Sequence, residues 1–437
     1  MVWCNHRRHF VIISNRSNQH KLGYLALIIC VLAGIEAGAQ GQESLPELGE
    51  AAVTEFWRAD SAAARAALVD EILASQTGVE ELVALFQAGP AYDADVPTGE
   101  QLRQRIDAEG AEYPYMLYVP EDYDPNQPYP LEFVLHGGVG RPRADAEENF
   151  WQRSYERVAQ PGRIIVIPFA WSEAYWWQDS QSENIPAILN ELKATYNVDE
   201  NRVTMTGISD GGTGAYFFAF KQPTQWAAFL PYIGHPGVLR SQQSGGGYRL
   251  YFENLMNKPL YIVNGENDRL YPAASLDSFI QILQDVGVSY TWTVIEEGEH
   301  NTSWLPDYQA VIEEFKADNP RDPLPANIQW VADRTDRYNR NHWIEINEMT
   351  EADRPSLLQV TRTGNQFEVD ARGVDRFTLL LSPHAVDFDL PLRVVVNGES
   401  KFDGMVEQSE ETLLDYATQD LDRTMLFTAK LNVSLVD

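Results

Sequence analysis

The sequence predicts a mixed α/β domain with a mostly parallel sheet, which follows an N-terminal helical extension and precedes an all-β domain. Apolar runs of strand length alternate with helical patterns in the middle of the chain, and such alternation is typical of a parallel sheet covered on both faces. Beyond the middle, short strand-like runs separated by turn signals indicate a sandwich-like β domain. A length of 437 residues is too great for one ordinary domain, so several units are expected.

The chain begins with a segment that has the three parts of a secretory signal peptide. Basic residues precede an apolar run at residues 22–35, and the small residues Ala37 and Ala39 follow it. This run is shorter than the roughly 20 residues that a membrane span needs. We therefore predict a signal peptide at 1–39, export to the periplasm or the extracellular space, and no integral membrane span after cleavage. An uncleaved N-terminal anchor is the alternative.

Net charge and cysteine content exclude several kinds of partner and site. The chain has 33 Lys and Arg against 64 Asp and Glu, a net charge of −31 that becomes −34 without the leader. A nucleic-acid partner is not expected, because binding nucleic acid requires a basic face. Both cysteines, Cys4 and Cys30, lie in the leader, so the exported protein would have no disulfide and no thiolate. We expect no metal and no other cofactor, since no metal-binding motif such as H-E-x-x-H occurs.

Residues 40–111 are predicted to form a helical N-terminal extension. Val53, Phe56 and Trp57 have the i, i+3, i+4 spacing of one helix face, and Gly78 interrupts the pattern. The segment contains no grouping of reactive side chains. We expect it to pack against the next domain.

Residues 112–320 are predicted to form the mostly parallel α/β domain. Seven apolar runs are interpreted as its strands: 116–119, 131–135, 164–167, 203–206, 229–233, 260–263 and 290–295. Four helical patterns separate the later runs: 185–196, 212–221, 274–286 and 308–317.

Residues 321–437 are predicted to form the all-β domain, after a linker rich in proline and charge at 318–325. Six short runs are interpreted as strands: 343–346, 357–360, 367–369, 377–381, 392–396 and 424–431. One helix is expected at 411–417.

The motif that indicates chemistry surrounds Ser209, between a predicted strand and a predicted helix. Gly207 and Gly211 flank it in the pattern G-x-S-x-G, and glycine is needed where a sharp turn brings backbone segments together. Such a turn lifts the serine hydroxyl above the sheet edge and places it at a helix N-terminus, where developing negative charge is favoured. We predict that Ser209 is a nucleophile.

A serine nucleophile needs a base and a group that orients the base. His300 follows the last predicted strand of the α/β domain, and Asp268 follows the strand before it. The chain order Ser209, Asp268, His300 is the order expected when all three lie at the carboxyl ends of strands. Glu266 is the alternative acid.

An oxyanion hole is expected from a second glycine-rich turn. His136 and Gly137 begin a loop directly after the predicted strand 131–135. The backbone N–H groups of Gly138 and Asp210 would then point to the same position and stabilise a tetrahedral oxyanion. His136 is interpreted as a support for the loop.

These motifs resemble the α/β-hydrolase superfamily over about residues 113–318. The closest resemblance is to secreted esterases of the poly(3-hydroxybutyrate) depolymerase and feruloyl esterase type, and to prolyl-oligopeptidase-like catalytic domains. The resemblance implies a serine hydrolase acting on a small-molecule or polymeric ester through an acyl-enzyme. Secreted depolymerases of this type usually carry disulfides, and the exported chain offers none.

An aromatic group and a further histidine are predicted to line the substrate pocket. Trp171, Trp176 and Trp177 follow the strand 164–167, and His235 follows the strand 229–233. Aromatic rings there could stack on a sugar, an aryl group or an acyl chain. The alternative is that two of the tryptophans cap the core beneath a long loop.

The function predicted is a secreted serine hydrolase that cleaves a carboxylic ester. A serine peptidase of prolyl-oligopeptidase-like type is the first alternative, although such domains normally work beneath a propeller and no repeat period is present. A catalytically dead protein that binds a glycan or polymer is the alternative from another class.

Overall fold

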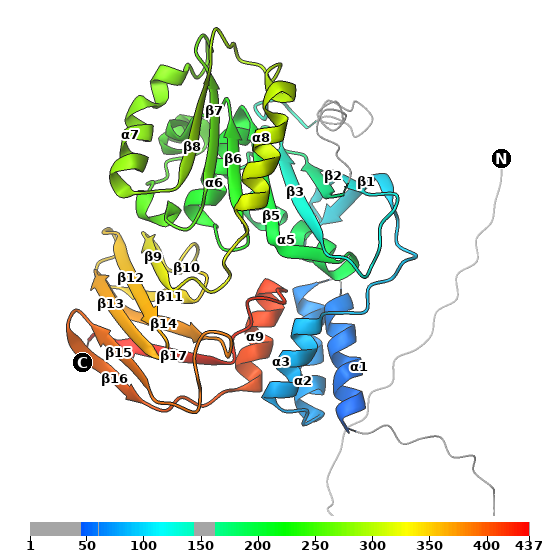
Figure 1. Ribbon diagram of the computed structural model, residues 1–437, viewed down its shortest axis with the longest axis vertical. Helices are drawn as coiled ribbons and strands as arrows, with labels where there is room; N and C mark the ends of the chain where they lie inside the picture. The colour runs from blue at the N-terminus through cyan, green and yellow to red at the C-terminus, as the bar shows by residue number, and fades with distance from the viewer. Residues whose placement is uncertain (1–44, 60, 144–161, 437) are drawn as a thin grey trace, which may run out of the picture. The chain divides into compact units, whose positions relative to one another are not determined.

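The computed structural model describes residues 45–59, 61–143 and 162–436 (Figure 1). The predicted signal peptide at 1–39 lies outside these residues. No helix among the described residues is long and apolar enough to cross a membrane.

The helical extension forms one cluster with a helix from the C-terminal region. Its helices are α1 (Leu45–Arg58), α2 (Ala62–Ala74) and α3 (Val79–Ala88), and they pack with α9 (Glu410–Asp420) (Figure 1). Phe56 and Trp57 of α1 and Phe86 of α3 are buried against Leu413 and Leu414 of α9. The apolar side chains of the extension are therefore buried against one another and against a helix that follows them by most of the chain length.

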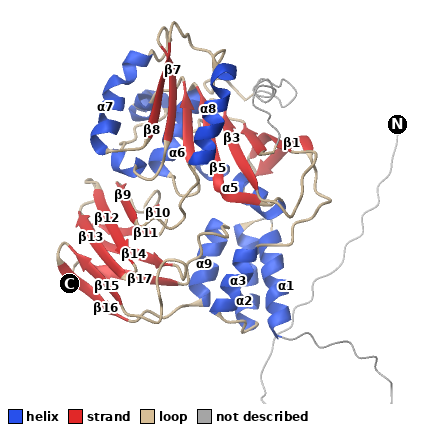
Figure 2. Cartoon of the chain, in the orientation of Figure 1, coloured by secondary structure: helices blue, strands red, loops and turns tan. Residues whose placement is uncertain are grey.

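The central domain is an eight-stranded sheet in the order β1-β2-β4-β3-β5-β6-β7-β8. From β3 onward the neighbouring strands are parallel, whereas β1 and β2 pair antiparallel at one edge. The strands are β1 (Gly99–Ile106), β2 (Glu112–Val119), β3 (Tyr129–Leu135), β4 (Ile164–Pro168), β5 (Val198–Ile208), β6 (Ala228–Tyr232), β7 (Leu260–Gly265) and β8 (Tyr290–Ile295). The helices are α5 (Asp179–Thr195), α6 (Asp210–Lys221), α7 (Asp277–Val286) and α8 (Leu305–Asp318), shown in blue around the red strands in Figure 2. The strand order and the parallel core are those of an α/β-hydrolase, as predicted.

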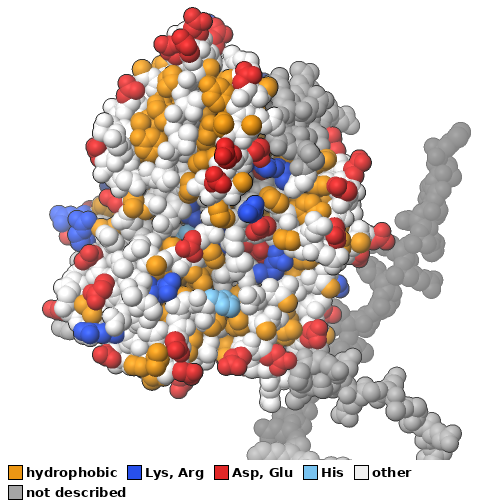
Figure 3. Space-filling model, viewed as in Figure 1, with side chains coloured by type: hydrophobic (Ala, Val, Ile, Leu, Met, Phe, Trp, Pro, Cys, Tyr) orange, Lys and Arg blue, Asp and Glu red, His pale blue; other side chains and the backbone are white. Residues whose placement is uncertain are grey.

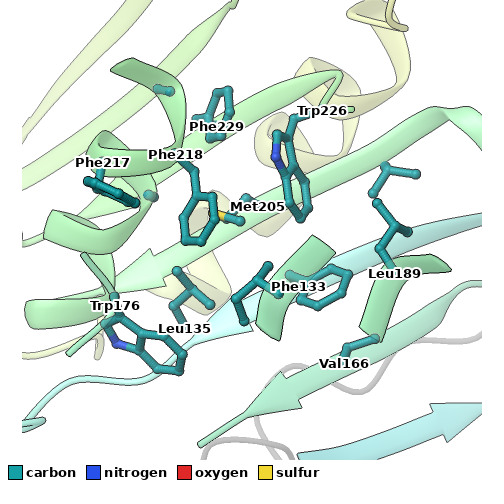
Figure 4. Close-up of a cluster of buried hydrophobic side chains, with 14 of the residues drawn as sticks. Phe133, Leu135, Val166, Trp176, Leu189, Met205, Phe217, Phe218, Trp226 and Phe229 are labelled. Carbon is teal, nitrogen blue, oxygen red and sulfur yellow. The ribbon is translucent and has the colours of Figure 1, made fainter. Parts of the chain in front are cut away.

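Helices cover both faces of this sheet. Successive residues of a strand point to opposite faces, so neighbouring residues belong to different cores. Phe229 and Ile262 join the core formed with α5, α6 and α7, whereas Leu230 and Val263 pack toward Ile312 of α8. Figure 4 shows the larger core, in which Phe133 and Trp226 pack edge to face with ring centroids 5.3 Å apart.

One strand of the sheet was not predicted. Residues 99–106 belong to the segment 40–111 that we expected to be helical, but they form β1. None of the eight residues of β1 is buried, and the sequence GEQLRQRI is mostly polar, as an edge strand permits. The strand therefore lacks the apolar run by which the other strands were identified.

The C-terminal region contains the expected two layers of sheet. A four-stranded sheet has the order β10-β11-β14-β17, and a five-stranded sheet has the order β16-β15-β13-β12-β9. Their facing side chains share one core, which includes Trp330, Leu358 and Phe377. The strands are β9 (Asn327–Ala332), β10 (Arg340–Asn341), β11 (Ile344–Met349), β12 (Ser356–Thr363), β13 (Gln366–Arg372), β14 (Val374–Leu381), β15 (Leu392–Val396), β16 (Glu399–Gly404) and β17 (Ala429–Ser434). The predicted strand 424–431 is wrong at its start, since β17 begins at Ala429, and β9, β10 and β16 were not predicted.

Buried ion pairs join the C-terminal segment to the α/β domain. Arg321 Nη2 lies 2.7 Å from Asp422 Oδ2, and Lys193 Nζ of α5 lies 3.9 Å from the same oxygen. Burial alone would raise the pKa of Asp422, but Arg321 and Lys193 hold it well below its usual range. All three side chains are at most 2% exposed, so each charge depends on the others for compensation.

A second buried carboxylate, Glu132 of β3, lies between two cations of the α/β domain. Lys316 Nζ of α8 lies 2.7 Å and Arg163 Nη1 lies 2.9 Å from Glu132 Oε2. Burial would raise the pKa of Glu132, but Lys316 and Arg163 lower it to about 2. The Lys316–Glu132 ion pair therefore connects α8 to β3.

Candidate active site

Ser209 occupies a strained turn between β5 and α6. Its φ of 59° and ψ of −117° are rare for a residue with a side chain, and its N–H donates to the carbonyl of Tyr232 at 2.9 Å. A Cβ on Gly207 would lie 2.0 Å from the carbonyl oxygen of Gly211, and one on Gly211 would lie 1.9 Å from that of Leu135. Only glycine fits at these two positions, which explains the G-x-S-x-G pattern physically.

The structure brings Ser209, His300 and Asp268 together from the ends of β5, β8 and β7. Ser209 Oγ lies 2.8 Å from His300 Nε2, and His300 Nδ1 lies 2.7 Å from Asp268 Oδ2. Because an ionised carboxylate only accepts, the proton on the imidazole is assigned to Nδ1, which leaves Nε2 to accept from the serine hydroxyl. The arrangement can remove a proton from Ser209.

Asp268 is held in place by the loop that follows β7. Its side chain is fully buried, and Oδ1 accepts the backbone N–H groups of Leu270 at 2.8 Å and Tyr271 at 2.9 Å. The alternative acid, Glu266, is exposed and accepts the N–H of Glu297 at 3.0 Å. Asp268 is therefore the acid that lies against His300.

The expected oxyanion loop differs from the prediction in one respect. We expected the N–H of Gly138 to be open to a substrate, but it donates to Asp210 Oδ2 at 2.9 Å. The N–H of Val139 donates to the same oxygen at 3.0 Å. Gly138 has φ of +73°, and successive N–H groups in such a turn converge on one acceptor and form an anion-binding nest. In this structure the nest holds the protein's own carboxylate.

The other predicted donor, the N–H of Asp210, starts helix α6. The first N–H groups of a helix have no acceptor within the helix, and they favour nearby negative charge. This N–H lies next to Ser209 in the chain. It therefore remains a suitable donor to an oxygen at the reacting carbon.

His136 supports the oxyanion loop, as interpreted from the sequence. Its Nδ1–H donates to the carbonyl of Gly137 at 2.9 Å, and its Nε2 accepts the N–H of Ala170 at 3.1 Å. Burial lowers the pKa of His136 to about 4, so the ring is neutral near pH 7. The ring also stacks on Phe169, with centroids 5.3 Å apart.

Two of the three tryptophans predicted to line the pocket are part of the core. Trp176 is fully buried and donates from Nε1 to the carbonyl of His136 at 2.9 Å, so it fixes the oxyanion loop from below. Trp177 is 2% exposed and donates to the carbonyl of Ser244 at 2.9 Å. The prediction of a pocket wall is wrong for both. Trp171 is half-buried and stacks on Phe169, so it alone of the three remains accessible from solvent.

The structure adds Tyr271, which the sequence reasoning missed. Its ring lies 5.9 Å from the ring of His300 and 5.8 Å from the ring of His235. Burial, with Asp210 and Asp268 nearby, raises its pKa. The sequence did offer a signal for placing Tyr271 near the site, since it lies three residues after Asp268 in the same loop.

His235 lines a cavity whose walls include none of Ser209, Asp268 and His300, so its role in a substrate pocket stays a prediction, and its ring has a defined tautomer. Its Nδ1 accepts the N–H of Gly237 at 2.9 Å, so the proton is assigned to Nε2, which donates to the carbonyl of Ser275 at 3.3 Å. No group of three or more His, Cys, Asp or Glu side chains within the described ranges is arranged to hold a metal ion.

Comparison with known proteins finds esterases, although no family model matches the chain. It is 30% identical over 163 residues to the "Probable feruloyl esterase C" of Aspergillus niger, which covers 36% of this chain and 56% of that protein. It is 24% identical over 180 residues to the "Bifunctional acetylxylan esterase/xylanase XynS20E" of Neocallimastix patriciarum, over 40% of this chain and 24% of that protein. The chain thus spans between a quarter and just over half the length of these curated relatives.

Among solved structures, a thermostable esterase matches with a TM-score of 0.42 and 24% identity, over 51% of this chain and 63% of that one. An S-formylglutathione hydrolase from Staphylococcus aureus matches with a TM-score of 0.39 and 19% identity, over 51% of this chain and 98% of that one. The sheet order is that of the α/β-hydrolase fold, and over about two fifths of its length the chain is similar to carboxylic esterases.

Proposed function

We propose that the protein is an exported serine esterase that works through an acyl-enzyme, with Ser209, His300 and Asp268 as its catalytic triad. The observation that carries the proposal is the continuous hydrogen-bonded path from Ser209 Oγ through His300 to Asp268. Export is proposed from the leader-like segment at 1–39.

In this mechanism Ser209 Oγ attacks the ester carbonyl carbon while His300 Nε2 takes the hydroxyl proton. Asp268 keeps Nδ1 protonated and stabilises the imidazolium that forms. The C–O bond to the alcohol then breaks, and His300 returns the proton to the departing oxygen. Water repeats the sequence on the acyl-enzyme, which releases the acid and restores Ser209.

The oxygen that becomes negative is proposed to bind the N–H groups of Asp210 and Gly138. The Gly138 donor is held by the Asp210 carboxylate in the free protein, at 2.9 Å. We propose that the oxyanion replaces this carboxylate oxygen during the reaction. Losing one oxyanion donor typically costs about 3 kcal/mol of transition-state stabilisation, so this exchange matters for rate.

The acyl group is proposed to be acetyl or feruloyl, the groups named for the two curated relatives. Trp171 is half-buried above the His136 loop and could contact an aryl or sugar ring there.

The test is activity-based labelling together with a substrate panel. A fluorophosphonate should label the wild type and fail to label Ser209→Ala, and hydrolysis of p-nitrophenyl acetate and methyl ferulate should fall by at least about 10³-fold in that variant. Peptide anilides should turn over far more slowly than the esters. Equal labelling of both proteins, or turnover that survives in Ser209→Ala, would refute the proposal. A preference for anilides would support the peptidase alternative instead.

A further inference from the structure

A cavity of about 680 Å³ lies beside the candidate active site, and nothing in the triad mechanism uses it. It is formed by the turn η2 (Pro236–Arg240), by residues 247–252 and by α7. Its walls are mainly aromatic and apolar: Tyr248, Tyr251, Phe252, Phe279 and Ile282. A cavity of this size suits one or two rings of a small molecule.

The charge of this cavity is opposite to that of the chain. Its positive charge comes from Arg240 and Arg249, and no Asp or Glu is among its lining residues. The chain as a whole carries nearly twice as many acids as bases, and acidic side chains are spread over the face in Figure 3. A basic, aromatic cavity on such a protein favours an anion that also has an apolar face.

Two of the polar side chains that line this cavity already form hydrogen bonds within the protein. Arg249 donates from Nη1 to the backbone carbonyl of Asp353 at 3.0 Å, a contact that orients the guanidinium without neutralising it. The hydroxyl of Tyr251 donates to Asp333 at 3.2 Å and also interacts with the Arg249 side chain, so the Asp333 carboxylate lies next to this wall and offsets part of the positive charge. Arg240 and the remaining N–H groups of Arg249 are the cationic donors that a ligand would bind.

The cavity is close to Ser209 through two aromatic contacts. His235 on its wall contacts the ring of Tyr271 at 5.8 Å, and Tyr271 contacts the ring of His300 at 5.9 Å. The ring of His235 is thus within about 12 Å of the ring of His300, the sum of the two distances. A substrate of two or three linked rings could reach from the reacting carbonyl into the cavity.

We propose that this cavity is a subsite for a ring that bears a carboxylate, carried by the substrate on the side away from the scissile bond. The inference rests on the proposed esterase function. Arg240 and Arg249 would bind the carboxylate through guanidinium hydrogen bonds, and Tyr248 and Phe279 would contact the ring. Two sources share this chemistry: an aryl carboxylate and a uronic acid sugar.

Binding can be tested in Ser209→Ala, which removes turnover. The probes are benzoate with its neutral amide, and a methyl glucuronide with the matching neutral glucoside, each titrated calorimetrically. We expect one acid to bind at least 10-fold more tightly than its neutral partner. Replacing Arg240 and Arg249 by Ala should remove that difference, whereas replacing both by Lys should retain part of it. Replacing Arg372 on β13 and Arg393 on β15 by Ala, two exposed arginines, is the control for the same change of net charge.

The acid that binds identifies the source of the ring. If neither acid binds better than its neutral partner, or if the double Ala variant binds both acids as before with unchanged thermal unfolding, the subsite proposal is overturned.

Kinetics then separate this proposal from the esterase function. For an ester that carries the preferred acid, the double Ala variant should raise KM at least 10-fold with little change in kcat, and it should leave a neutral ester unaffected. A wild type that hydrolyses neutral esters but shows no dependence on these arginines would retain the esterase function and overturn the subsite. A wild type that binds the acid but hydrolyses no ester would overturn the esterase function and the substrate role of the cavity, and leave the binding site itself supported.

Discussion

Neutralising Asp210 should accelerate hydrolysis of neutral esters. In the free protein, Asp210 Oδ2 accepts the N–H groups of Gly138 and Val139, at 2.9 and 3.0 Å. The proposed oxyanion needs the first of these donors and must displace the carboxylate to reach it. In Asp210→Asn the competing group becomes a neutral carbonyl oxygen, which is a weaker acceptor.

The magnitude follows from the two hydrogen bonds. A bond to a charged group contributes about 1 kcal/mol more than a neutral one, so two bonds hold the carboxylate by about 2 kcal/mol more than they would hold an amide. If the whole difference is recovered in the transition state, kcat/KM rises by about 30-fold, which is an upper bound. The loop itself should persist, because His136 and Trp176 hold it independently of Asp210.

The assay is kcat/KM for p-nitrophenyl acetate at pH 8, with thermal unfolding measured on the same samples. Glu266→Gln is the matched control, since it removes the same charge from an exposed side chain on the neighbouring loop and should leave kcat/KM unchanged. A fall in kcat/KM for Asp210→Asn, with the unfolding temperature unchanged, would refute the reasoning. It would mean that the carboxylate holds the donors in their working position.

Three further predictions concern stability. Glu132→Gln should lower the free energy of unfolding by about 2 kcal/mol near pH 7, because it leaves Glu313 as the one carboxylate that pairs with both Lys316 and Arg163. The loss of stability that the folded pKa of about 2 imposes between pH 4.5 and 2 should disappear; denaturant unfolding across that range tests both effects, and an unchanged loss contradicts the prediction. Because burial lowers the pKa of His136 to about 4, the unfolded chain binds this proton at a higher pH than the folded protein, and about 3 kcal/mol of the free energy of unfolding should be lost as the pH falls from 6.5 toward 4. His136→Asn should flatten this pH dependence, and an unchanged dependence would show that another group titrates. Asp422→Asn should lower the free energy of unfolding by about 3–5 kcal/mol, because Arg321 and Lys193 stay buried without this carboxylate. Denaturant unfolding and the rate of proteolysis of the C-terminal region measure the effect, and wild-type values for both would contradict the role of these ion pairs.

The main strands and the positions of Ser209, Asp268 and His300 could be predicted because each leaves a local signal. An apolar run marks a buried strand, and a nucleophile turn needs glycines at fixed offsets, as the close contacts of Gly207 show. The polar strand β1 left no such signal, because its pairing with β2 rather than burial holds it in place.

The side-chain contacts around the oxyanion loop could not be predicted. Whether Trp176 faces a substrate or the core depends on how the loop folds back onto β3, and its bond to the His136 carbonyl joins segments far apart in sequence. The same holds for Asp210, whose carboxylate meets the Gly138 loop only in the folded protein. Residue type and strand order predicted where the chemistry would be placed, and packing determined which neighbours support it.

The helix cluster of α1, α2, α3 and α9 has a consequence for how the chain is made. The first three helices are synthesised early, but Leu413 and Leu414, which cover their apolar side chains, are synthesised near the end. Until then Phe56, Trp57 and Phe86 can pack only on one another, and the side that α9 will cover presents an apolar surface that chaperones or other unfolded chains can bind. A truncation within the β domain that removes α9 would therefore expose apolar side chains near the other end of the chain as well, and the yield of folded protein would depend on completing α9.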